Sequence, residues 1–179
     1  MLNLQAPLAI MQWVMENKKF LTPPVSNKIL YPCEDFIIMI VGGPNNRLDY
    51  HVNPTQEFFF QLTGDIVLRT QQKKVDGDAQ GSFEIVDIPI KEGEIFLLDA
   101  HIPHSPQRFE NTVGLVIERK RMVHQLDQFV WFCPVCNKLT HQESVKVNDI
   151  EKDLPNLFDK VYQKFPSKDF TCLACQNLK

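Results

Sequence analysis

The sequence predicts a mainly β protein, folded as an antiparallel sandwich or barrel, with a short N-terminal helix and a small C-terminal tail. Seven short segments rich in β-branched and aromatic residues follow one another between residues 36 and 119. Turn residues such as Gly, Pro, Asn and Asp separate these segments, as is typical of strands with tight connections. Because no helical pattern interrupts the run, antiparallel strands are favoured over a parallel sheet with crossover helices.

The first expected element is an amphipathic helix, because Pro7 precedes apolar residues at helical spacing between positions 8 and 15. A strand at 36–41 follows and ends at the turn sequence Gly-Gly-Pro-Asn-Asn. Further strands are predicted at 48–52, 57–62, 65–71, 83–89, 94–98 and 112–119, with a polar hairpin loop at 72–80. In the tail, 148–151 is typical of a helix N-cap, and apolar residues at 154, 157, 158, 161, 162 and 165 form one helical stripe.

Size and charge limit the classes of function. A chain of 179 residues can bury one good core and a small appendage. The net charge is −3 and the basic residues are scattered, which argues against a nucleic-acid-binding surface. The first seven residues contain neither a basic segment nor a long apolar run, so we expect a cytoplasmic protein without a membrane partner.

His51, Glu57 and His104 are the most informative residues, because two imidazoles and one carboxylate can bind a divalent metal on one face. The opposite face of the metal is then free for substrate and dioxygen, as in non-haem Fe(II) oxygenases. His51 and Glu57 are six residues apart, and Pro54 between them can supply a bend that lets them converge. His101 competes with His104 for the third ligand position.

The blocks 51–64 and 93–104 resemble the paired motifs of the cupin superfamily, which form a jelly-roll type, double-stranded β-barrel with a metal at its mouth. The cupin spacing from Gly93 favours His104 over His101 as the ligand. One departure is Asn53, which occupies a position where many cupins have a second histidine. The ligand set is thereby reduced to two histidines and one glutamate, which leaves one more coordination position open.

Three segments are similar to the 3-hydroxyanthranilate 3,4-dioxygenase family more specifically: RLDYH at 47–51, EFFFQLTG at 57–64 and PHSPQR at 103–108. The later GLVIER at 114–119 fits the same family, and the similarity covers essentially the whole chain. The resemblance implies Fe(II) bound by His51, Glu57 and His104, and 3-hydroxyanthranilate and O₂ as substrates. The implied product is 2-amino-3-carboxymuconate semialdehyde, the precursor of quinolinate on the route from tryptophan to NAD. It also implies a homodimer.

The same resemblance implies roles for further side chains. Arginine suits a carboxylate-bearing substrate, because its planar guanidinium can form two parallel hydrogen bonds to a carboxylate. Considered alone, each arginine could be ordinary surface charge, and Glu118 could simply pair with Arg119 or Arg121. On that resemblance, Glu118 could accept the hydroxyl proton of the substrate or hydrogen-bond its amine. The catalytic residues implied are Arg47, Arg108 and Glu118, and the substrate-binding residues are these three with Glu57, Asn27 and Phe59.

The tail contains two Cys-x-x-Cys pairs, Cys133 with Cys136 and Cys172 with Cys175, which can together form a tetrahedral metal site. Disulfides are the alternative, but a reducing compartment disfavours them. The first pair resembles a rubredoxin knuckle, and its spacing does not distinguish zinc from iron. Because four thiolates leave no open coordination position, the site is expected to be structural. We therefore expect a cupin domain at 1–128 and a metal-binding tail at 129–179.

Two other classes of function fit the same residues. A cupin thiol dioxygenase or isomerase would use the same metal face, but an aminothiol substrate does not require the arginine pair. A metal-containing binding module would have an inert barrel and would use its tail as an interaction surface.

Overall fold

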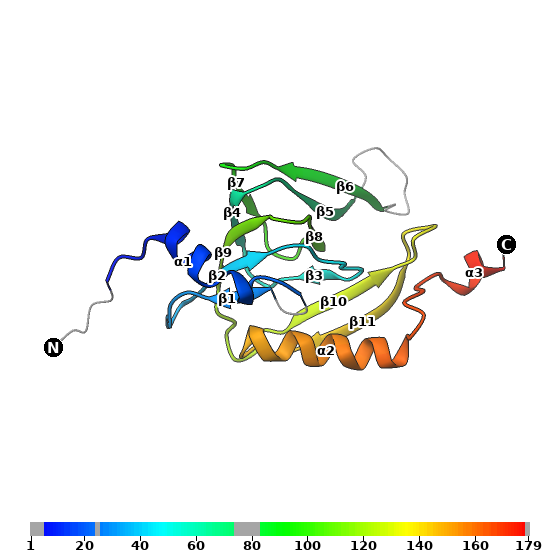
Figure 1. The fold of residues 1–179 in the computed structure, drawn as a ribbon. Helices are drawn as coiled ribbons and strands as arrows, with labels where there is room; N and C mark the ends of the chain where they lie inside the picture. Colours follow the sequence, from blue (N-terminus) through cyan, green and yellow to red (C-terminus); the bar gives the residue numbers. More distant parts are fainter. Residues whose placement is uncertain (1–5, 24–25, 74–82, 178–179) are drawn as a thin grey trace.

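Two antiparallel sheets face each other in the computed structural model, which describes residues 6–23, 26–73 and 83–177 (Figure 1). One sheet has the strand order β1-β2-β9-β4-β7 and the other has the order β11-β10-β3-β8-β5-β6. The expected mainly β fold is therefore confirmed. The strands are β1 (Asn27–Ile29), β2 (Phe36–Gly42), β3 (Tyr50–Val52), β4 (Glu57–Thr63), β5 (Ile66–Lys73), β6 (Phe83–Ile90), β7 (Ile95–Leu98), β8 (His104–Arg108), β9 (Val113–Arg119), β10 (Asp127–Phe132) and β11 (Leu139–Val145).

Each of the seven strands predicted from sequence coincides with an observed strand, while β1, β8, β10 and β11 were not predicted. The expected hairpin loop at 72–80 begins inside β5, and its residues 74–80 lie outside the described part of the chain. Strand β8 has the sequence His-Ser-Pro-Gln-Arg, whose one apolar residue is Pro106, although four of its five residues are buried. Its burial therefore reflects a polar interior at this point of the barrel.

Apolar side chains fill the space between the sheets. Phe59 on β4, Leu68 on β5 and Val116 on β9 are at most 2% exposed and belong to one cluster. Successive residues of a strand point to opposite faces. Every second residue of these strands therefore points into the interior together with Phe59, Leu68 or Val116. The interior thus combines this apolar cluster with the buried polar residues described below.

The remaining elements are helices at the two ends of the chain. They are α1 (Ile10–Glu16), the 3₁₀ helix η1 (Lys18–Phe20), α2 (Ile150–Lys164) and α3 (Leu173–Gln176). The expected N-terminal helix corresponds to α1, where Val14 packs in a cluster with Leu21 and Ile40. None of the helices in the described residues is long and apolar enough to cross a membrane.

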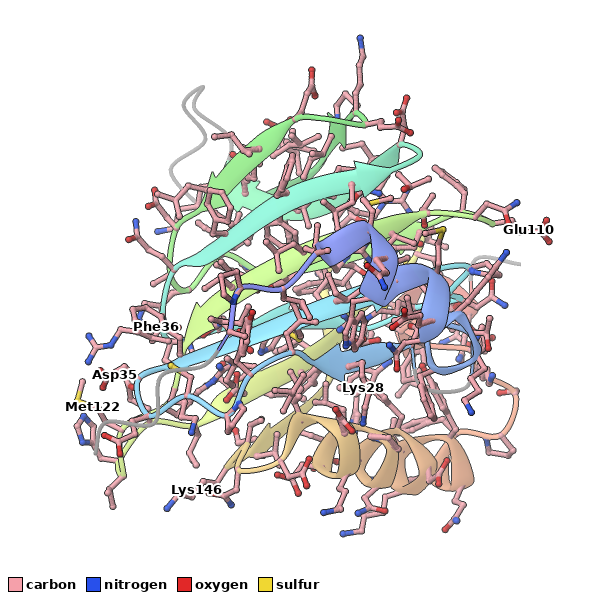
Figure 2. The ribbon with its side chains drawn as sticks, turned by 60° about the vertical axis from the view of Figure 1, so that its left-hand side comes forward. Lys28, Asp35, Phe36, Glu110, Met122 and Lys146 are labelled. Carbon is pink, nitrogen blue, oxygen red and sulfur yellow. The ribbon has the colours of Figure 1, made fainter. Side chains whose placement is uncertain are left out.

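Helix α2 packs beside β10 and β11 (Figure 1) and closes one side of the sandwich. Its predicted apolar stripe is confirmed, because Val161 and its neighbours on the stripe pack against Phe129 and Trp131 of β10. The predicted N-cap is also confirmed, since the Asp149 side chain accepts a hydrogen bond from the Glu151 amide at 3.1 Å. Glu151 joins α2 to β1, where Lys28 points toward the helix (Figure 2), and the ion pair measures 2.7 Å.

The expected boundary between residues 128 and 129 falls inside β10. This strand pairs with β3 on one side and with β11 on the other. Both β10 and β11 therefore belong to the six-stranded sheet. The division of the chain into a cupin domain and a tail stays a prediction.

Candidate metal centre and its surroundings

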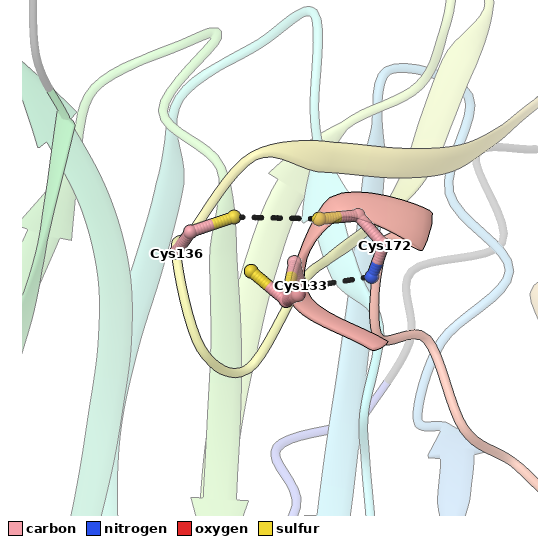
Figure 3. Close-up of side chains that lie close together, drawn as sticks. Cys133, Cys136 and Cys172 are labelled. Atoms are coloured by element: carbon pink, nitrogen blue, oxygen red, sulfur yellow. Dashed lines mark hydrogen bonds between the residues drawn. The ribbon is translucent and has the colours of Figure 1, made fainter. Parts of the chain in front are cut away.

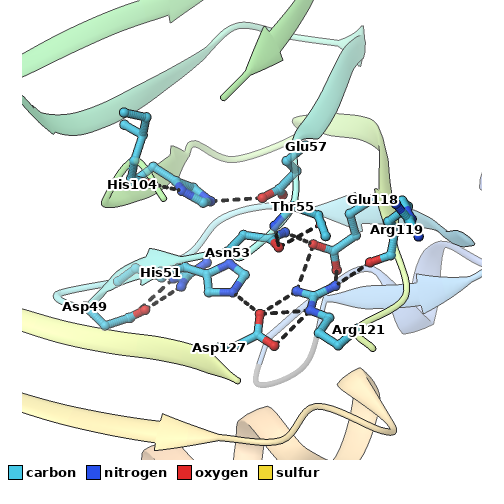
Figure 4. Close-up of polar contacts among 12 residues, drawn as sticks. Asp49, His51, Asn53, Thr55, Glu57, His104, Glu118, Arg119, Arg121 and Asp127 are labelled. Atoms are coloured by element: carbon cyan, nitrogen blue, oxygen red, sulfur yellow. Dashed lines mark hydrogen bonds and ion pairs between the residues drawn. The ribbon is translucent and has the colours of Figure 1, made fainter. Parts of the chain in front are cut away.

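Strand register brings the three expected metal ligands together. His51 on β3 is the direct partner of His104 on β8, and Glu57 on β4 approaches from the opposite sheet. One ligand atom from each residue lies within 4.8 Å of the others, and the residues are 7%, 1% and 6% exposed, respectively. Figure 4 shows His104 and Glu57 directed at each other above the His51 ring. His101 is exposed and lies outside this group, which we call the His–Glu–His group.

The hydrogen bonding of His104 shows that this group fits a cation. His104 Nδ1 lies 2.9 Å from the carbonyl oxygen of Ile102, which can only accept, so Nδ1 carries the hydrogen of the neutral ring. The bare Nε2 then faces Glu57 Oε2 at 3.0 Å, and this buried oxygen has no hydrogen-bond donor among the described residues. Two ligand atoms that bind one ion at a right angle, each about 2.1 Å from it, are about 3.0 Å apart, which equals the observed distance between Nε2 and Oε2. A cation bound by both atoms removes the conflict between the two lone pairs.

His51 is fixed from behind by a second carboxylate. Its Nε2 lies 2.6 Å from Asp127 Oδ1, and Asp127 is fully buried at the start of β10. The imidazole also stacks on Phe129, with ring centroids 4.8 Å apart and an angle of 9° between the planes. Burial lowers the pKa of His51 and outweighs the opposing effect of Asp127. A neutral imidazole is the form that binds a metal.

The charge of Glu57 also suits a ligand. Burial by itself raises the pKa of this carboxyl group, but positive charge on His104 and His51 more than compensates and lowers the pKa to about 2. When the two rings are neutral, a bound cation would supply that positive charge instead. Glu57 is therefore ionised at neutral pH and can contribute a negative charge to the metal centre.

Glu118 lies beside Glu57, because the two residues are register partners on β9 and β4. Arg121 forms an ion pair with Glu118 at 3.0 Å, and Asn53 donates a short hydrogen bond to the same carboxylate (Figure 4). Asn53 occupies the position where many cupins have a second histidine ligand, and here it binds the Glu118 carboxylate instead. Burial and the neighbouring Glu57 raise the pKa of Glu118 to about 7, although Arg121 opposes the shift.

The two expected substrate-binding arginines differ in their surroundings. Arg108 on β8 is 3% exposed, and its guanidinium donates to Gln61 Oε1 at 3.5 Å. Burial lowers the pKa of Arg108 to about 10, so the side chain stays charged at neutral pH. Arg47 forms an ion pair with Asp49 and lies 5.9 Å from the ring centre of Phe158 on α2. The charge of Arg47 also lowers the pKa of Arg108.

Gly114 on β9 makes room for Arg108. A Cβ atom at this glycine would lie 3.0 Å from Arg108 Nη1 and 2.8 Å from Gln61 Oε1. The guanidinium therefore lies directly against the β9 backbone, and glycine is the residue that permits this approach.

Phe59 and Asn27 are the remaining expected pocket residues. Phe59 is buried, and its ring meets the His104 ring edge-on at a centroid distance of 6.4 Å. Asn27 begins β1 at the edge of the five-stranded sheet, opposite Val41. The structure thus places Phe59 at the His–Glu–His group, while the role expected for Asn27 stays a prediction.

A hollow of about 240 Å³ borders this network at Arg121, but the His–Glu–His group does not line it. Apolar side chains of β1, β2 and α2 form much of its wall, including Ile29, Ile37 and Ile150. Arg121 lines the same hollow and contacts Glu118, so the hollow adjoins the buried acid.

The four tail cysteines form a second candidate metal site, with all four Sγ atoms within 4.8 Å of one another. All four thiols are free, and Cys136 Sγ lies 3.6 Å from Cys172 Sγ (Figure 3). This separation excludes a disulfide, whose sulfur atoms are about 2.05 Å apart. It matches two vertices of a tetrahedron with metal–sulfur bonds of about 2.3 Å. Burial raises the pKa of Cys133, but backbone N–H groups of Cys172 and Cys136 help to lower it to about 6, which favours the thiolate.

Sequence reasoning missed Asp127, Phe129 and Gln61 as residues of the site. Arg121 was considered only as an ion-pair partner, and Asn53 only as a missing ligand. Alternation along β4 could have shown Gln61, since Glu57, Phe59 and Gln61 must share a face. Asp127 had no comparable signal, because its position depends on the pairing of β10 with β3.

The fold and the site define a small double-stranded β-barrel with a buried group of two histidines and one carboxylate. Comparison with known proteins gives the family, since the model for 3-hydroxyanthranilic acid dioxygenase matches residues 1–162. The 3-hydroxyanthranilate 3,4-dioxygenase of Xanthomonas campestris pv. campestris (strain B100) is 44% identical over 169 residues, 94% of this chain and 89% of that protein. The enzyme of the same name from Bacillus thuringiensis (strain Al Hakam) is 46% identical over 145 residues, 81% and 76% of the two chains.

Solved structures include a cupin-2 domain containing protein from Shewanella frigidimarina, which is 16% identical with a TM-score of 0.42. The match covers 59% of this chain and 91% of that one. The family match and the two bacterial relatives show that this chain belongs to the 3-hydroxyanthranilic acid dioxygenase family. The expected resemblance, and with it the expectation of an enzyme, is confirmed.

Proposed function

We propose that this protein is an Fe(II)-dependent, ring-cleaving dioxygenase that converts 3-hydroxyanthranilate and O₂ to 2-amino-3-carboxymuconate semialdehyde. The observation that carries the proposal is the bare His104 Nε2 directed at the unsatisfied Glu57 Oε2, with His51 beside them. When bound there, iron would supply the redox chemistry with O₂, and the three protein ligands would leave its remaining positions to substrate and O₂. The product would then serve as the precursor of quinolinate on the route to NAD.

The two arginines are proposed to bind the carboxylate of the substrate. The charge of Arg47 lowers the pKa of Arg108, so an anion bound by both side chains would relieve their mutual repulsion. A guanidinium can hold a carboxylate through two parallel hydrogen bonds, each worth about 1.5–3 kcal/mol when charge-assisted. Phe59, whose ring meets the His104 ring edge-on, would contact the aromatic ring. This combination suits an aromatic acid better than an aminothiol.

Glu118 is proposed to accept the proton of the substrate hydroxyl group. Its pKa of about 7 lets it exist as a carboxylate at neutral pH and still hold a proton once it has accepted one. Asn53 and Arg121 fix the carboxylate in position, and Arg121 can stabilise its charge. The alternative role proposed for Glu118 is a hydrogen bond to the amine of the substrate.

The proposal is tested by loading the protein with Fe(II) under anaerobic conditions and then adding 3-hydroxyanthranilate and air. We expect O₂ uptake with a matching rise in near-ultraviolet absorbance from the muconate product. His104→Ala should abolish both signals, whereas His101→Ala, which changes an exposed histidine outside the group, should retain them. Absence of both signals in the loaded wild-type protein would contradict the proposed function.

Three expectations complete the proposal. The cysteine site is proposed to hold structural zinc or iron in a tail that follows the cupin domain. The protein is proposed to be cytoplasmic, and it is proposed to form a homodimer.

A further inference from the structure

The proposed function assigns no role to Asp127, a fully buried carboxylate in direct contact with an expected metal ligand. We propose that Asp127 is a positioning residue that fixes the His51 ring, so that one chosen ring nitrogen faces the metal. The inference rests on the proposed metal site, but it does not depend on the identity of the substrate.

The contact between the two side chains determines which nitrogen is free. The Asp127 oxygen 2.6 Å from His51 Nε2 accepts hydrogen bonds, so Nε2 of the neutral ring carries the hydrogen. Nδ1 is then the bare nitrogen, and it is left for the metal. His104 also has one bare nitrogen, but it is the other one: Nδ1 donates to the Ile102 carbonyl, which leaves Nε2 bare. Carboxylates and carbonyls that bind the second nitrogen of a histidine ligand commonly set its orientation.

Asp127 can act in this way because it is itself held rigidly. Arg121 donates from Nε to both Asp127 oxygens, at 3.0 and 2.8 Å, and its side chain is 1% exposed. The next-but-one residue, Phe129, is the register partner of His51 and stacks on its ring. The imidazole is therefore confined by a hydrogen bond at its edge and by an aromatic ring at its face.

Arg121 extends the arrangement to the proposed proton acceptor. The same guanidinium contacts Asp127 on one side and Glu118 on the other, as Figure 4 shows. Movement of Asp127 would therefore disturb both the His51 ring and the position of Glu118. A buried ion pair with a merely structural role would support the fold but would not select a ring nitrogen.

The first test uses the wild-type full-length protein with zinc, a diamagnetic stand-in, in both sites. Long-range ¹⁵N–¹H correlation spectra of the histidine rings report which nitrogen carries hydrogen. We expect the His51 signals to show a protonated Nε2 and a metal-bound Nδ1. A protonated Nδ1 with a metal-bound Nε2 would overturn the proposal, and no substitution is needed to reach this result.

The second test measures the dissociation constant of Co(II) at the barrel site by competition with a chelator. Asp127→Ala should weaken binding by about 10–100-fold, and Asp127→Asn, which retains one acceptor oxygen, should weaken it less. Glu143→Gln is the matched control, because Glu143 pairs with His141 at 2.9 Å and both residues lie outside the His–Glu–His group. It should leave the constant unchanged.

The metal content of the cysteine site and the melting temperature report the fold of each variant. A folded Asp127→Ala protein with wild-type cobalt affinity would show a merely structural role and would overturn the proposal. If Asp127→Ala does not fold, Asp127→Asn is compared with the wild type instead. Unchanged cobalt affinity in Asp127→Asn, together with a hydrogen on Nδ1 of His51 in the wild type, would then overturn the proposal. If Asp127→Ala weakens cobalt binding but the iron-loaded wild-type protein does not cleave the ring, the positioning role stands and only the proposed function is overturned.

Discussion

Single residues shape the proposed substrate site through very close contacts. Gly114 allows the Arg108 guanidinium to lie against β9, where an added Cβ would stand 3.0 Å from Nη1. Gly114→Ala should displace the guanidinium and weaken one charge-assisted hydrogen bond, which raises KM by about tenfold. Steady-state kinetics and iron analysis check this result. Iron content should stay at the wild-type level, and an unchanged KM would show that Arg108 does not bind the substrate.

The acid Glu118 gives the site its expected pH dependence. If the carboxylate is the proton acceptor, kcat/KM should rise with pH as Glu118 loses its proton, and then level off. Burial and Glu57 raise its pKa to about 7, while a cation bound at Glu57 would offset the Glu57 charge. The rise should therefore be centred at or below pH 7. Glu118→Gln should lower activity and remove this limb of the profile, and a limb that persists in the variant would assign it to another group.

At the scale of elements, the cap of α2 secures the helix that closes the sandwich. The Asp149 carboxylate accepts from the Glu151 amide, and Asp149→Ala should lower the free energy of unfolding by about 1 kcal/mol. Chemical denaturation measures the change. Asp159→Ala, at an exposed position in the third turn of α2, is the control and should stay within about 0.5 kcal/mol of the wild type. Equal losses in both variants would show that the cap does not contribute.

Local patterns explain which elements could be predicted from the sequence. The stripe of α2 and the strands that supply the apolar cluster have regular spacing, and the structure confirms them. Strand β8 could not be found in this way, because the interior beside it is polar and its buried residues include His104 and Arg108. The motifs identified His51, Glu57 and His104, yet Asp127 joins them only through the pairing of β10 with β3, which is a long-range contact.

At the scale of the whole molecule, β10 connects the two candidate metal sites. Asp127 at its start contacts His51, and Cys133 follows directly after its end. Six residues of extended chain span about 20 Å, so the sites share a strand but cannot share a ligand. We therefore expect independent metal binding at the two sites, combined with a shared effect on stability.

Two variants separate these effects when the metal content of purified protein is measured. His104→Ala should lose the barrel metal and retain the cysteine-bound metal, because the four thiolates bind without help from the barrel. Cys175→Ser should lose the cysteine-bound metal and retain the barrel metal, but its melting temperature should fall, since metal binding stabilises the folded tail. Loss of both metals in the cysteine variant would mean that the tail is needed to build the barrel site. Such a result would place β10, which Asp127 and Cys133 delimit, at the centre of that dependence.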